Sequence, residues 1–265
     1  LDPPFNQDKH YNNHNDRMPA DEYWKWMENI CKLICENSSD GGAIYFMQRE
    51  KNTREVLETL VSAGWTFQNL IIWKKKASAV PASCRFGKHY QIIAFATKGK
   101  KPRVFHKLRI NPPLLKNEKH PRPRGVYVTD VWDDIREMTS GYFAGNEPLR
   151  LETGERLHKQ QSPVRLLARV ILSSSDVGDM VFDPFAGTGT TLVTARQLER
   201  HSLGTEIDPV NVSFIRKRIS EIRVSDNLLS FRSDYQHTEN LEDIWPVSED
   251  NMPCVSDDSG QLAIF

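Results

Sequence analysis

The sequence lacks several features that would place it in a membrane or outside the cell. It has no apolar run near the roughly 18 residues of a membrane span, and no charged-then-apolar leader begins it. Cysteine is scarce as well, because four in a chain of 265 residues do not make a disulfide framework. Cys31 and Cys35 have no His or Cys partner at zinc-ligand spacing, so we expect them to be core thiols. These absences predict a cytoplasmic protein without a metal site.

Net charge is absent too, because 35 acidic and 35 basic residues cancel. This balance disfavours a uniformly basic nucleic-acid binder. The charges are segregated, however: residues 98–124 are densely basic, and the chain beyond Ser225 is acidic. A basic, proline-broken stretch is either a solvated loop or a phosphate-contacting insertion, and we favour the insertion. The candidate phosphate contacts of this insertion are Lys98, Lys100, Lys101, Arg103, Lys107, Arg109, Arg122 and Arg124.

Hydrophobic periodicity alternates between that of helices and that of strands, which predicts an α/β sheet with helices on both faces. Ser162 and Pro163 have the residue types of a helix N-cap and first helical position. The expected helices cover 21–38, 52–64, 190–200 and residues after 163 and 208, and the expected strands cover 41–47, 66–73, 90–97, 178–183 and 201–208.

Two prolines follow an acid at the start of the chain, in Asp2-Pro3-Pro4-Phe5. Consecutive prolines fix φ and lack N–H donors, so this segment reads as a rigid turn at the end of a strand. Such a turn can hold one carboxylate, one backbone carbonyl and one aromatic face around a small planar ligand. An ordinary proline turn is the alternative, and the tetrapeptide alone does not decide between them.

A glycine-rich turn lies between a predicted strand and helix, over Asp183 to Thr191. Such a turn binds nucleotide-like ligands because glycine lets the backbone approach closely and the helix N-terminus offers free N–H groups. A phosphate loop would need a lysine here, and a dinucleotide fingerprint would need glycine in place of Leu192. Glu206 lies 17 residues after Gly189, near the spacing of ribose-binding carboxylates. A nucleoside with a non-phosphate arm fits this pattern.

In this order, the two motifs resemble those of the S-adenosylmethionine-dependent DNA amino-methyltransferases with the permuted β arrangement. The resemblance covers most of residues 1–222 and implies a Rossmann-like, doubly wound, mostly parallel sheet. The family's catalytic tetrapeptide ends an apolar strand of which only Leu1 is present, so we expect the chain as given to be truncated. A second departure is His158 to Pro163, where the family commonly has His-Pro-Thr-Gln-Lys-Pro.

The resemblance implies four segments: a catalytic half (1–97), a target-recognition insertion (98–157), a cofactor-binding half (158–223) and an acidic tail (224–265) that we expect to be disordered from about 247. Asp2 and the Pro3 carbonyl would accept hydrogen bonds from the amino group of a flipped base, and Phe5 would stack on it. The implied catalytic residues are Asp2, Pro3, Pro4 and Phe5. The implied cofactor contacts are Asp183, Pro184, Phe185, Ala186, Gly187, Thr188, Gly189, Thr190, Glu206, Asp208, Gln161 and Ser162.

The first residue of the tetrapeptide favours N6-adenine over N4-cytosine as the target, because Asp is commoner there in the adenine group. Double-stranded DNA is the implied substrate, and a cognate restriction endonuclease is a candidate partner. Alternatives from other classes are an NAD-binding oxidoreductase and a catalytically silent DNA-binding module. The last residues resemble the peptide by which bacterial proteins dock on the replisome's sliding clamp, through Gln261, Leu262, Ile264 and Phe265. The alternative is a segment that folds back onto the enzyme.

Overall fold

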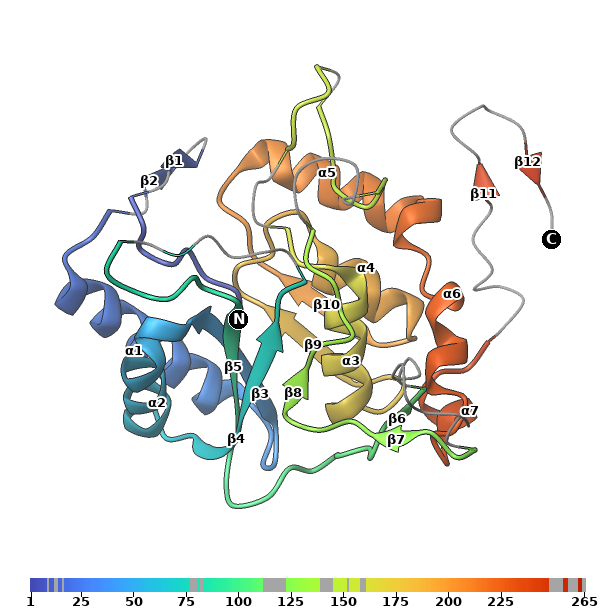
Figure 1. Cartoon of the computed structure of the whole chain (residues 1–265), viewed down its shortest axis with the longest axis horizontal. Coiled ribbons are helices and arrows are strands. Elements are labelled where there is room, and N and C mark those ends of the chain that lie inside the picture. The colour runs from blue at the N-terminus through green and yellow to red at the C-terminus, as the bar shows by residue number, and fades with distance from the viewer. Residues whose placement is uncertain are drawn as a thin grey trace. The chain divides into compact units, whose positions relative to one another are not determined.

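The computed structural model divides the chain into two compact units, the first Leu1–Phe105 with Thr129–Ile135 and the second His106–Val128 with Arg136–Phe265 (Figure 1). The predicted insertion 98–157 therefore contributes residues to both units. The structure describes residues 1–8, 10–11, 14–15, 17–76, 81, 83–111, 123–138, 145–151, 153–157, 161–247, 255–256 and 262–263.

A four-stranded sheet forms the centre of the first unit. Its strands, in spatial order, are β3 (Ala43–Arg49), β5 (Tyr90–Thr97), β4 (Thr66–Lys74) and β8 (Val131–Trp132). β5 is antiparallel to both of its neighbours, and β8 is parallel to β4. The expectation of a mostly parallel sheet is therefore wrong for these strands. β5 can return antiparallel to β4 because the link between the two strands contains no described helix.

Two helices cover this sheet, α1 (Ala20–Asn37) and α2 (Thr53–Ser62), the second preceded by the short η1 (Glu50–Asn52). α2 contacts β3, β4 and β5, and α1 packs on α2 (Figure 1). Cys31 and Cys35 are buried on α1, as expected for core thiols, and burial raises the pKa of Cys31 to about 12. Two strands of two residues each, β1 (His10–Tyr11) and β2 (His14–Asn15), form an antiparallel hairpin before α1.

The second unit contains the predicted β-α-β-α run. Its elements are α3 (Val164–Ser174), β9 (Met180–Asp183), α4 (Thr190–Gln197), β10 (His201–Gly204) and α5 (Pro209–Ser220). β9 and β10 pair in parallel, as a strand, helix and strand in succession require. A short hairpin of β6 (Arg109–Ile110) and β7 (Val126–Tyr127) lies in the same unit.

The acidic segment after Arg223 packs on the second unit as far as Trp245. It forms η3 (Val224–Asp226), α6 (Leu229–Arg232), η4 (Ser233–Tyr235) and α7 (Leu241–Ile244). Tyr235 and Trp245 are fully buried in one core cluster with Leu172 and Leu198. The first part of the predicted tail is thus part of the core, because Leu228, Leu241 and Ile244 are buried in the same cluster. β11 (Val255–Ser256) and β12 (Leu262–Ala263) form a separate antiparallel pair.

A membrane span would need a long apolar helix, and none occurs in the part of the chain that the structure describes.

Candidate active site

The tetrapeptide begins where the chain leaves the edge of the first unit's sheet. The Leu1 amino group donates to the Tyr45 carbonyl at 2.8 Å, and the Met47 N–H donates to the Leu1 carbonyl at 2.9 Å. This pair of bonds flanks Phe46 and is the pattern of a parallel ladder. The residues after Leu1 therefore run alongside β3 toward its carboxyl end. In α/β sheets, this is the end at which ligands bind.

A buried tyrosine holds the second proline of this turn. The Tyr23 hydroxyl donates to the Pro4 carbonyl at 2.7 Å and accepts from Gln48 Nε2 at 3.0 Å. Tyr23 and Gln48 are 3% and 0% exposed, so both bonds lie in the core and are shielded from water. Sequence reasoning missed both residues, because Tyr23 is indistinguishable from an ordinary core position of α1.

Asn6 fixes the other end of the turn. Its Nδ2 donates to the Met18 carbonyl at 2.7 Å and its Oδ1 accepts from the Met18 N–H at 2.8 Å, with φ at +50°. Asn6 is not among the residues predicted from the sequence, although Asn tolerates this left-handed conformation better than most residues and is common in turns. The tetrapeptide is thus anchored on both sides. Asp2 is half-buried, whereas Phe5 is 5% exposed, so base stacking by its ring stays a prediction.

The second predicted motif forms a tight turn between β9 and α4. Asp183 organises it, because Oδ1 accepts from the Phe185 N–H at 3.1 Å and Oδ2 accepts from the Thr191 hydroxyl at 2.5 Å. Gly189 has φ +79°, and a Cβ there would come within 2.9 Å of Ile215. Gly187 has φ +52°, and a Cβ there would meet only the Phe185 carbonyl oxygen, at 3.9 Å. The backbone at Gly187 is therefore open to the close approach of a ligand.

Glu206 follows β10 and is held by one carboxylate oxygen. Its Oε1 accepts from the Asp208 N–H at 2.9 Å and from Asn211 Nδ2 at 3.3 Å. Among the described residues no hydrogen bond is found at Oε2, which suits a carboxylate that accepts from ribose hydroxyls. Asp208 is 5% exposed and N-caps α5 through the Val210 N–H, so its carboxylate has a structural function. The loop and Glu206 together fit a nucleoside cofactor.

A buried ion pair supports the glycine loop from behind. Arg218 Nη1 donates to the Thr188 carbonyl and to Thr190 Oγ1, each at 3.0 Å. The same guanidinium donates to both oxygens of Asp226, at 2.7 and 2.8 Å, and Arg223 also pairs with Asp226. Burial by itself would raise the pKa of Asp226, but hydrogen bonds from the two arginines outweigh it and lower the pKa. No local pattern in the sequence indicates this pairing.

The predicted cofactor contacts Gln161 and Ser162 lie just before α3. Gln161 Oε1 accepts from the Leu149 N–H at 3.0 Å, and its Nε2 donates to the Glu147 carbonyl at 3.2 Å. The prediction that Ser162 is the N-cap of α3 is wrong. Pro163 is the N-cap residue, and Glu147 Oε1 accepts from the Val164 N–H at 2.6 Å instead. A carboxylate at this end also matches the positive pole of the helix.

The predicted DNA-contacting residues are distributed over both units. Lys98 caps the end of α1, because its Nζ donates to the Ser38 carbonyl at 2.7 Å. Its neighbours up to Arg103 lie at the amino end of β3, since Gly42 pairs with Lys98. In the second unit, Arg109 lies over the Tyr127 ring and donates to the Arg124 carbonyl. Lys107 is exposed, and Arg122 lies outside the described residues.

Known proteins with similar sequences are DNA methyltransferases. Residues 1–217 match the DNA methylase family of N6 and N4 enzymes. Type II methyltransferase M1.MboII of Moraxella bovis is 26% identical over 245 residues, which cover 85% of this chain and 89% of that protein. Type II methyltransferase M2.DpnII of Streptococcus pneumoniae is 30% identical over 197 residues, 74% of this chain and 65% of that protein. The chain spans only 51% of M.BamHI of Bacillus amyloliquefaciens, at 28% identity.

Solved structures of the same kind share the fold. PvuII DNA methyltransferase, described as cytosine-N4-specific, has a TM-score of 0.59 at 16% identity and covers 91% of this chain and 83% of its own. M1.HpyAVI, in complex with S-adenosylmethionine, has a TM-score of 0.52 at 22% identity and covers 76% and 85%. Because a family match over more than half of the residues accompanies this likeness of fold, the chain belongs to the N6/N4 DNA methylase family.

Proposed function

We propose that the protein transfers a methyl group from S-adenosylmethionine to the N6 amino group of an adenine flipped out of DNA. The observation that carries this proposal is the anchored tetrapeptide at the carboxyl end of β3, with Tyr23 on Pro4 and Asn6 on Met18. Membership of the DNA methylase family supports the reaction class.

The residues of the tetrapeptide act on the base. An exocyclic amino group is a poor nucleophile, because its lone pair is delocalised into the ring. Hydrogen bonds from its N–H groups to the Asp2 carboxylate and the Pro3 carbonyl would favour a tetrahedral nitrogen and localise that lone pair. A rigid turn supplies this geometry without reorganisation, so in-line positioning accounts for most of the rate.

When bound, S-adenosylmethionine would supply an electrophilic methyl group: the S–CH3 bond breaks as the N–CH3 bond forms, S-adenosylhomocysteine is the leaving group, and the amino nitrogen loses one proton to water. Gly187 opens the loop backbone to the cofactor, and Glu206 would accept from its ribose hydroxyls. Replacing Glu206 with Ala should therefore weaken cofactor binding, because charge-assisted hydrogen bonds contribute about 1.5–3 kcal/mol. An unchanged dissociation constant in calorimetry would argue against this role of Glu206.

A second candidate function is N4-cytosine methylation. It is favoured by the likeness to PvuII DNA methyltransferase, which covers 91% of this chain. Asp2 supports adenine as the target base, because Asp is commoner at this position of the tetrapeptide in the adenine group. The experiment is to incubate the protein with DNA and S-adenosylmethionine, digest the product to nucleosides and identify the methylated one by mass spectrometry. We expect N6-methyladenine, and N4-methylcytosine would replace the first candidate with the second.

We also propose that the final residues dock on a sliding clamp. Leu262 belongs to β12, and Gln261, Ile264 and Phe265 lie outside the described residues. A short apolar anchor raises the local concentration of an enzyme at its partner. Deleting 261–265 should abolish capture by purified clamp and leave the melting temperature unchanged. No capture of the intact protein, or a clear fall in melting temperature on deletion, would contradict the proposal.

A further inference from the structure

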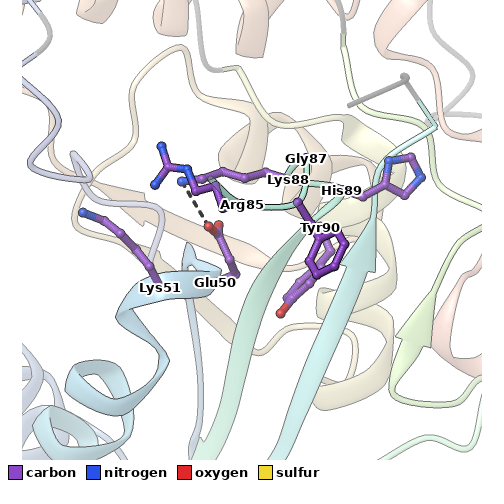
Figure 2. A pocket seen from close by; sticks show the side chains of 8 residues that line it. Glu50, Lys51, Arg85, Gly87, Lys88, His89 and Tyr90 are labelled. Carbon is purple, nitrogen blue, oxygen red and sulfur yellow. Dashed lines mark ion pairs between the residues drawn. The ribbon is translucent and has the colours of Figure 1, made fainter. Parts of the chain in front are cut away.

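A hollow of about 350 Å³ in the first unit combines positive charge with exposed aromatic rings (Figure 2). Two segments line it, Glu50–Lys51 of η1 and Arg85–Tyr90, which leads into β5 and ends on its first residue. An ion pair of 3.0 Å between Lys88 and Glu50 joins these segments. Phe86 is 96% exposed and Tyr90 is 40% exposed.

The hollow has more positively charged side chains than its one acidic residue can neutralise. Glu50 is paired with Lys88, and no ion pair of Lys51 or Arg85 is found within the described part of the chain. Two positive charges are therefore available to a ligand. An exposed phenylalanine by itself is ordinary, but a ring beside uncompensated cations is the arrangement that binds unstacked nucleotides.

The register of the sheet puts the hollow at the same end as the tetrapeptide. Arg49 is paired with Gln91, and Lys74 with Tyr90, so the residues before β5 lie beyond the carboxyl ends of β3 and β4. The parallel bonds of Leu1 direct Asp2–Phe5 to that end too. By contrast, Lys98 pairs with Gly42 at the opposite end, and the seven residues of β3 span about 20 Å.

We propose that this hollow binds one unstacked nucleotide of the DNA strand, with its phosphate on Lys51 and Arg85 and its base against Phe86. The inference rests on the proposed function, because a base flipped toward the tetrapeptide leaves its neighbours unstacked. It locates a DNA contact outside the basic segment 98–124, at η1 and the loop ahead of β5.

The test compares two pairs of charge-removing variants from the first unit. Lys51→Ala with Arg85→Ala empties the hollow of free cations, whereas Lys25→Ala with Lys32→Ala removes the same charge from the exposed face of α1. Phe86→Ala removes the exposed ring, and Phe67→Ala, at the start of β4, is its matched control. Binding of each protein to a duplex with one unpaired base is measured by fluorescence anisotropy over a range of salt concentrations.

We expect the Lys51 and Arg85 variant to bind at least tenfold more weakly and to lower the salt slope by about 0.9, the amount for one lost phosphate contact. Phe86→Ala should bind about tenfold more weakly at an unchanged salt slope, since stacking is not a charge effect. The two control variants should lose less. Equal losses in the controls, or unaltered binding by the hollow variants, would overturn the proposal while wild-type methylation of DNA still upheld the proposed function. A wild-type protein that binds no DNA would overturn both.

Discussion

The hydroxyl of Tyr23 holds Pro4 of the tetrapeptide in place. Replacing Tyr23 with Phe removes the hydroxyl that donates to the Pro4 carbonyl and accepts from Gln48, which is fully buried. We expect a loss of about 1–3 kcal/mol in the free energy of unfolding, because buried polar groups are left unpaired. The single-turnover methylation rate should fall about tenfold, the equivalent of about 1.4 kcal/mol.

The control for this change is Tyr127→Phe, since Tyr127 is 49% exposed. Chemical denaturation and single-turnover kinetics measure the two effects, and cofactor affinity should not change. A Tyr23→Phe protein with wild-type kinetics would mean that the Pro4 carbonyl needs no such donor.

The carboxyl group of Glu147 makes the free energy of unfolding depend on pH. The pKa of Glu147 is raised from 4.5 to about 7, mainly by burial and further by the charge of Asp226. The hydrogen bond from the Val164 N–H and the charges of Arg218 and Arg223 act in the opposite direction. A carboxyl group with a raised folded-state pKa favours folding when protonated, so this contribution is present below about pH 4.5 and is lost as pH rises through about 7.

Glu147→Gln should remove that loss and make unfolding free energy less dependent on pH between about 5 and 7. Glutamine keeps an oxygen for the Val164 N–H, so α3 keeps its cap. Exposed Glu155→Gln is the control. Denaturant titrations at several pH values measure the effect, and identical pH profiles of the wild type and Glu147→Gln would contradict it.

At the scale of elements, the Arg218–Asp226 pair joins α5 and η3 to the glycine loop. Lysine in place of Arg218 keeps the charge but cannot reach Asp226, Thr188 and Thr190 together, because it lacks the planar fork of the guanidinium. We expect a destabilisation approaching the roughly 3–5 kcal/mol of a broken buried pair. Affinity for S-adenosylhomocysteine should also fall, since the loop loses its support.

Arg216→Lys on the exposed face of the same helix is the control. Calorimetry at a temperature where Arg218→Lys remains folded separates the two effects. If its cofactor affinity equals that of the control, then the pair stabilises the fold without positioning the loop.

The same elements mark where sequence reasoning succeeds and where it stops. Helices α1, α2, α4 and α5 and their neighbouring strands are predicted, because periodicity and caps are local signals. The antiparallel course of β5 and the buried state of Tyr235 and Trp245 are not, since both depend on distant partners. The capping of α3 by Glu147 replaces a local signal at Ser162 with a contact 17 residues away.

For the whole molecule, the sequence predicts both turns, and each lies in its own unit, while the roles of their residues stay predictions. The supporting residues Tyr23, Gln48, Arg218 and Asp226 are not predicted, because a buried polar residue at a helical position has no distinctive pattern in one sequence. The glycine loop is predicted well, since Gly187 and Gly189 adopt backbone conformations that other residues rarely do.

Single-turnover methyl transfer by Asp2→Ala, measured together with its cofactor affinity, tests the catalytic role of the tetrapeptide most directly. Asp2 acts on the base in this account, so the variant should lose methyl transfer to DNA while its dissociation constant for S-adenosylmethionine stays within a few-fold of wild type. Methyl transfer at the wild-type rate by Asp2→Ala would contradict the assignment of the tetrapeptide as the catalytic motif.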